Sequence, residues 1–64
     1  MSRINLEPNL ERPDDFYEAL IAAHEGMEEA ESHAFNARLI FILANHIGSQ
    51  DVLVSALDAA RTKS

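Results

Sequence analysis

The 64-residue sequence contains no cysteine, so neither a disulfide bond nor a thiolate metal site can stabilise it. A chain of this length forms one domain at most, and its core usually supplies no more than about 3–5 kcal/mol of net stability. Burial against a partner or a second copy is then the support that remains. Composition alone therefore favours an interaction protein.

Long hydrophobic stretches are also missing. The longest apolar run, residues 39–44, is far shorter than the roughly 20 residues that span a bilayer. The N-terminal residues lack the apolar stretch of a signal peptide. We therefore expect a cytoplasmic protein that does not associate with membranes.

Basic residues are few. Five Lys and Arg stand against eleven Asp and Glu, and residues 7–31 carry nine of these acids with one base. Phosphate backbones are bound by clustered Lys and Arg, so we expect no nucleic-acid partner. The acidic half could steer the chain toward a basic patch on a protein, or it could serve only to keep a small protein soluble.

Two glycines and two prolines divide the chain. Residues 1–12 form an extended arm, and Pro13 suits the first turn of a helix because its missing N–H has no partner there. Gly26 and Gly48 mark helix ends, since glycine accepts the left-handed conformation common at those positions. We predict a single helical domain over residues 13–62, with helices at about 13–25, 28–47 and 50–61.

Apolar residues recur with helical period in the first and third predicted helices, and each helix thereby gains one core face. The two stripes are Phe16, Leu20, Ala23 and Met27, widened by Tyr17 and Ile21, and then Leu53, Ala56, Leu57 and Ala60. Short connections at single glycines favour antiparallel neighbours. The predicted fold is all-α: an antiparallel three-helix hairpin or bundle with an extended N-terminal arm, which we expect to be dimeric.

The second predicted helix is apolar on two sides. The presumed core side holds Phe35, Leu39, Ile42, Leu43 and Ile47. The other side holds Ala34, Ala37, Phe41 and Ala44, spaced i, i+3, i+7 and i+10. The alanines allow another helix to approach closely, and Phe41 is typical of an interface anchor. We predict a partner or dimer interface at these four residues, with coverage by the other two helices of the same chain as the open alternative.

Polar residues near the end of the second helix offer a further contact. Arg38, Asn45 and His46 could touch a partner or a small ligand. Alternatively, Asn36 and His46 point toward the presumed core and hydrogen-bond to nearby groups there, as buried polar side chains must.

Catalytic and metal chemistry find little support. The chain has no nucleophile elbow and no glycine-rich phosphate loop, so we expect no enzyme and no catalytic residues. Glu29 and His33 share a helix face at i, i+4, but no second motif completes a metal site. We expect no metal and no cofactor.

Two segments, PDDFYEALIAAH at 13–24 and NARLIFILANHIG at 36–48, resemble a family of short bacterial proteins catalogued as a domain of unknown function, the DUF2783-type proteins. The resemblance spans residues 9 to about 61. It implies a bacterial, cytoplasmic protein encoded beside flavin-dependent aromatic monooxygenases and other aromatic-degradation enzymes, and it supplies no catalytic residues. Relatives often have Ser or Asp where this chain has Glu28, which weakens the cap of the second helix.

Three hypotheses follow for a non-enzymatic protein–protein interaction module. The first is an accessory subunit that docks on a larger catabolic enzyme of the flavin-dependent aromatic monooxygenase type, through the Phe41 side, the acidic first helix, or both. The second is a self-contained homodimer with a structural or regulatory role, and it is compatible with the first. The third, which we favour least, is a metal- or small-ligand-binding protein that uses Glu29 and His33.

Overall fold

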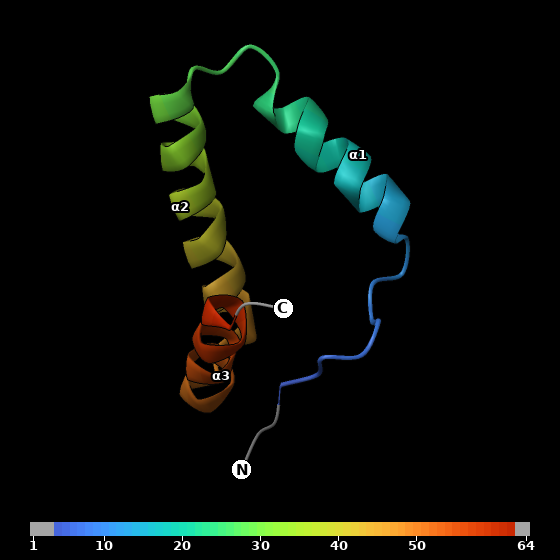
Figure 1. Ribbon diagram of the computed structural model, residues 1–64, viewed down its shortest axis with the longest axis vertical. Coiled ribbons are helices and arrows are strands. Elements are labelled where there is room, and N and C mark those ends of the chain that lie inside the picture. The colour runs from blue at the N-terminus through green and yellow to red at the C-terminus, as the bar shows by residue number, and fades with distance from the viewer. Residues whose placement is uncertain (1–3, 63–64) are drawn as a thin grey trace.

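The computed structural model describes residues 4–62 and contains three helices joined by short connections (Figure 1). Their bounds are Pro13–His24 for α1, Glu29–Ile47 for α2 and Gln50–Arg61 for α3. No strand occurs between residues 4 and 62, which confirms the all-α prediction. Compared with the expected bounds, α1 ends one residue earlier and α2 begins one residue later.

The junction between α2 and α3 follows from two neighbouring residues. Gly48 takes the left-handed conformation, with φ at +78°, and its N–H donates to Ala44 O at 2.9 Å to close α2. Ser49 then begins α3, because its Oγ accepts the N–H of Val52 at 3.3 Å. The chain therefore turns sharply within a few residues, and α3 packs against the end of α2.

The connection between α1 and α2 is longer. Gly26 is left-handed, with φ at +79°, and lies beyond the last residue of α1. Although Glu28 replaces the usual capping residue, its N–H donates to Glu31 Oε1 at 2.9 Å. One of the unpaired donors at the start of α2 is satisfied by this bond.

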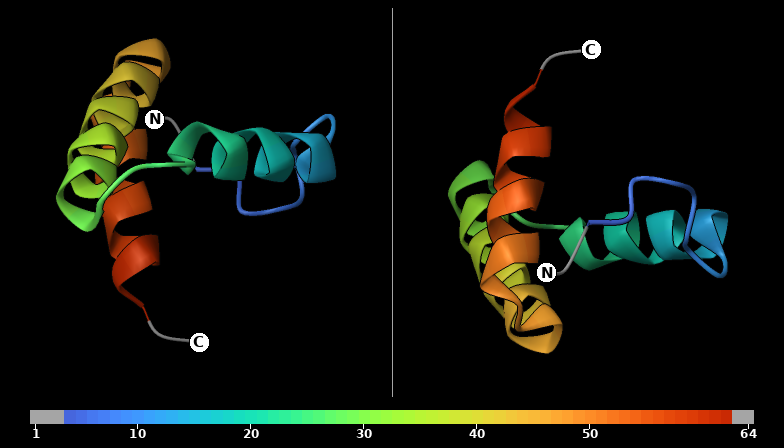
Figure 2. Two further views of the ribbon diagram at one scale, coloured as in Figure 1. Left: turned by 90° about the horizontal axis from the view of Figure 1, so that it is seen from above. Right: turned by 90° about the horizontal axis from the view of Figure 1, so that it is seen from below.

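The helices form an open arrangement. The pair that packs together is α2 and α3. Figures 1 and 2 show α3 lying across the end of α2, whereas α1 diverges from α2 and approaches it only near the connection between them. Residues 4–12 of the predicted arm turn back from the start of α1 toward the level of α3 (Figure 1), and residues 1–3 of that arm lie outside the described residues.

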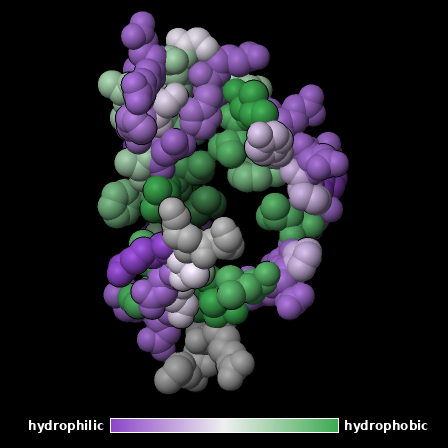
Figure 3. Space-filling view, in the orientation of Figure 1, coloured by the Kyte–Doolittle hydropathy of each residue, from purple (hydrophilic) through white to green (hydrophobic). Residues whose placement is uncertain are grey.

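This openness leaves residues 4–62 without a buried interior. Between residues 4 and 62, no side chain is buried. The radius of gyration is 13.5 Å, whereas a compact 64-residue chain would have about 10.7 Å. Figure 3 shows an opening through the middle of the molecule with apolar side chains around it. Side chains of one copy therefore do not fill the space between the helices.

The best-shielded side chains mark where the helices do meet. Half-buried apolar residues are Ile4, Leu20, Met27, Phe35, Leu39, Ala44, Val52, Leu53 and Ala56. Several residues assigned to core stripes by period are instead exposed, among them Phe16 at 48%, Ile42 at 65% and Leu57 at 64%. Apolar residues recur along these helix faces with the helical period, as the sequence predicts. Within residues 4–62, however, no second helix buries these faces.

His24 makes the contact between α1 and α2. Its ring lies edge-on to Phe35 with centroids 4.8 Å apart, and its Nε2 is 3.0 Å from Asn36 Oδ1. The other ring nitrogen, Nδ1, lies 2.8 Å from Leu20 O, and the ring tautomer decides which of the two nitrogens donates its N–H. One side chain therefore holds the end of α1 against α2.

Replacing His24 by alanine is expected to lower the free energy of unfolding by about 1–2 kcal/mol, because one aromatic contact and a hydrogen bond between helices are lost. His33→Ala is the matched control. His33 is exposed, and its 3.6 Å ion pair with Glu29 lies on the helix surface, so the cost should stay within about 0.5 kcal/mol. Urea denaturation at equal protein concentration measures both, and equal effects would contradict the assignment of His24.

Candidate interaction surfaces

The first candidate surface, the Phe41 face, consists of Ala34, Ala37, Phe41 and Ala44 on α2. Phe41 is 75% exposed, the highest value among the exposed large apolar side chains of the described chain. Ala34 and Ala37 are exposed and Ala44 is half-buried. Ile40, 63% exposed, extends the apolar surface beside them. A large aromatic side chain with this exposure among small apolar residues is characteristic of a contact surface.

The opposite side of α2 is the side that the chain partly covers. Phe35 and Leu39 are half-buried there, and Phe35 meets the ring of His24. Three residues placed on the core side are nevertheless exposed, Ile42 at 65% and Leu43 and Ile47 at 48% each. Burial therefore does not divide the two sides of α2 as cleanly as the sequence predicts.

The polar residues named near the end of α2 are open to solvent. Arg38, Asn45 and His46 are all exposed, and none of them makes a side-chain hydrogen bond or ion pair with another residue of the described chain. The expectation that His46 points into a core is wrong, because no core encloses that end of α2. Asn36 does have a partner, since its Oδ1 lies against the His24 ring.

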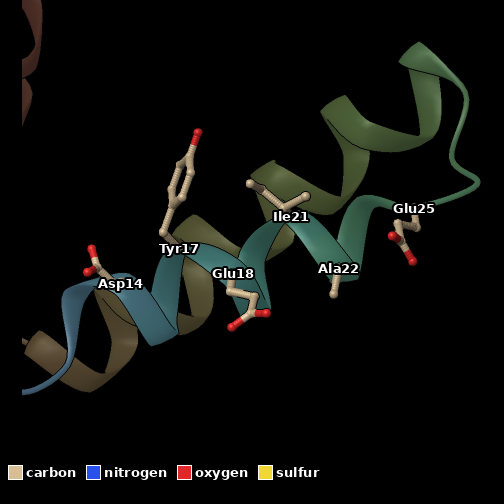
Figure 4. Close-up of a pocket in the computed structure, with 6 residues that line it drawn as sticks. All are labelled: Asp14, Tyr17, Glu18, Ile21, Ala22 and Glu25. Carbon is tan, nitrogen blue, oxygen red and sulfur yellow. The ribbon is translucent and has the colours of Figure 1, made fainter.

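A second surface, the Tyr17 face, lies on α1, the acidic helix that the sequence offered as a docking surface, although the sequence placed Tyr17 and Ile21 themselves in a core. A shallow depression follows one side of α1, and its lining residues are Asp14, Tyr17, Glu18, Ile21, Ala22 and Glu25. Tyr17 and Ile21 project to the same side of α1, one turn apart, with Asp14 on that side and Glu18 and Glu25 projecting away from them (Figure 4). Tyr17 and Ile21 are 65% and 50% exposed. The helical period of the apolar residues placed both of them in a widened core stripe. The acidic residues next to them in the sequence are the signal that could have indicated an exposed surface.

The Tyr17 face combines apolar anchors with negative charge. Tyrosine is enriched among the residues that dominate binding energy, because its ring buries a large area and its hydroxyl can hydrogen-bond. A rim of carboxylates attracts basic partners and suppresses acidic ones. This chemistry suits a protein surface that carries Lys or Arg around an apolar patch.

Metal ligands do not gather in the described chain. His33 Nε2 and Glu29 Oε2 are 3.6 Å apart, but both side chains are exposed. No group of three His, Asp or Glu side chains is placed to hold a metal ion within residues 4–62. None of the helices in that range is both long and apolar enough to cross a membrane.

Fold and surfaces together define a small all-helical protein that presents apolar side chains on two helix faces. Residues 4–62 match the model of the family described as "Protein of unknown function (DUF2783)". The chain belongs to this family, which confirms the resemblance carried by the 13–24 and 36–48 segments. No curated protein and no solved structure matches the chain.

Proposed function

We propose that this protein is a non-enzymatic protein–protein interaction module whose helices pack fully only against another protein surface. The observation that carries the proposal is the lack of any buried side chain between residues 4 and 62. Folding must offset roughly 1–2 kcal/mol of backbone entropy per residue, and apolar burial is the main term that does so. A partner that covers the exposed apolar faces supplies the burial that one copy lacks.

The surface area supports the same conclusion. A compact protein of 7.1 kDa is expected to expose about 4,100 Å². The chain exposes 6,002 Å², an excess of about 1,900 Å². A standard interface covers about 800 Å² on each partner, so the excess is large enough for more than one contact surface.

We further propose that the protein is a cytoplasmic accessory subunit of a larger bacterial catabolic enzyme, of the flavin-dependent aromatic monooxygenase type. The family resemblance suggests this partner, and the Tyr17 face gives the contact a chemical basis. Residues 7–31 bear nine acids and one base, so the partner surface should be basic. An enzyme of that type would supply the catalysis, and this chain would supply binding surface.

The test is a calorimetric titration of the purified protein into the purified flavin-dependent monooxygenase encoded beside its gene. Tyr17→Ala should weaken binding about 30-fold, since truncating an aromatic anchor typically costs about 2 kcal/mol. His33→Ala, on an exposed part of α2, should change the Kd by no more than about twofold. Binding should also weaken as salt is raised, because the acidic rim is solvent-exposed.

No heat of binding from the wild-type protein would contradict the accessory-subunit proposal. Binding that is indifferent to Tyr17→Ala and to salt would reject the Tyr17 face as its contact.

A further inference from the structure

We infer that a second copy of this chain covers the Phe41 face, with the two α2 helices packed against each other about a two-fold axis. The inference rests on the proposed function in that it names the partner of one of the two surfaces. It leaves the Tyr17 face free for a different protein.

The exposed surface in excess of that of a compact chain is large enough for a stable dimer interface. Obligate homodimers bury about 2,000–5,000 Å² in total, so a dimer needs about 1,000 Å² or more from each copy. The excess of about 1,900 Å² in each copy supplies this area and leaves about 900 Å² for the Tyr17 face. A chain without a core also needs its partner from the time it is made. A second copy is present whenever the chain is, so self-association needs no other protein.

The spacing of residues on α2 provides a self-complementary contact. Ala37, Ile40, Ala44 and Ile47 recur at i, i+3, i+7 and i+10, the heptad pattern by which two helices interlock. Ile40 and Ile47 are 63% and 48% exposed, and Phe41 lies beside them at 75%. Large and small residues alternate along this line. Two copies related by a two-fold axis can therefore set the large side chains of one against the alanines of the other.

A parallel line on the opposite side of α2 is already used within one copy. Ser32, Phe35 and Leu39 follow the same spacing and are half-buried. The helix thus has two lines of helix-packing residues. The line of Phe35 and Leu39 meets elements of the same chain. On the other line Ala44 is half-buried as well, and Ala37, Ile40 and Ile47 remain exposed for a helix from outside the chain.

Charge distribution favours a second copy in spite of the net charge of −6. The stretch between Glu31 and Asp51 contains no acidic residue, and Arg38 is the one Lys or Arg within it. The acid-free stretch coincides with the Phe41 face. Two acidic chains can therefore meet along α2 without opposing carboxylates, and the centres of interfaces are typically depleted in charged residues.

Single-cysteine variants test the inference, because the natural chain has no cysteine to interfere. Ile40→Cys places a thiol at the middle of the proposed contact, and Ala59→Cys places one on the exposed surface of α3. With a short bis-maleimide, Ile40→Cys should give a covalent dimer in about tenfold higher yield than Ala59→Cys, because only paired positions lie within reach. Equal yields, or none from either variant, would overturn the inference.

Adding Phe41→Glu to the Ile40→Cys variant should reduce the cross-linked yield about tenfold, since a carboxylate is placed in an apolar contact. Leu6→Glu is the matched control: Leu6 is 72% exposed but lies in the arm, and the yield should stay within about twofold. A cross-link that survives Phe41→Glu would overturn the assignment of this face, whether or not that variant folds alone.

The cross-linking result and the enzyme titration separate the two proposals. Cross-linking at residue 40 without enzyme binding would remove the accessory role and leave the dimer. Enzyme binding without cross-linking at residue 40 would remove the dimer and leave the accessory role.

Discussion

Dilution alone is expected to unfold this protein. If two copies share one core, folding and association are a single equilibrium, and the stability of the folded state depends on protein concentration. Each tenfold dilution then lowers the free energy that holds the folded dimer by about 1.4 kcal/mol. Circular dichroism at 222 nm should show a Tm that rises over about 1 to 500 µM and a loss of helix at the dilute end.

The covalent dimer formed through Ile40→Cys is the control for this experiment. Because its two copies cannot separate, its helix content and Tm should not change with dilution. A wild-type Tm that is equally independent of concentration would contradict a core shared between copies.

The second large effect is expected at Leu39, which is half-buried on the covered side of α2. Leu39→Ala should lower the free energy of unfolding by about 2 kcal/mol, near the low end for leucine truncation, because the site is not fully enclosed. Ile42→Ala removes a similar side chain one turn away on the same helix, but from a position that is 65% exposed. Its cost should stay below about 1 kcal/mol.

Urea unfolding of both variants at one protein concentration measures the difference. An equal or larger loss for Ile42→Ala would mean that the covered side of α2 lies around Ile42, and that the contacts made by Phe35 and Leu39 contribute little.

The helices themselves could be predicted because their ends depend on local chemistry. Gly48 in the left-handed conformation and the Ser49 cap need only neighbouring residues, so the boundary between α2 and α3 follows from the sequence. The same holds for Pro13 in the first turn of α1. Such signals act within one helical turn and do not require knowledge of the rest of the fold.

The arrangement of the helices could not be predicted in the same way. The period at which apolar residues recur identifies the apolar face of a helix, but it does not indicate which element covers that face. Phe16, Tyr17 and Ile21 on α1 were all assigned to a core, yet α1 meets α2 only around His24 and leaves these residues exposed. On α2, Leu39 is half-buried and Phe41 is exposed, but Ile42 on the presumed core side is 65% exposed and Ala44 on the other side is half-buried.

The central claim, that one copy of this chain lacks a core and obtains it from a second copy, is tested most directly by the mass of the purified protein in solution. Light scattering behind size exclusion, repeated over a range of loading concentrations, gives that mass without reference to shape. The account predicts a species of twice the 7.1 kDa chain mass that retains its helix content. A folded, fully helical species of 7.1 kDa at every concentration would contradict it.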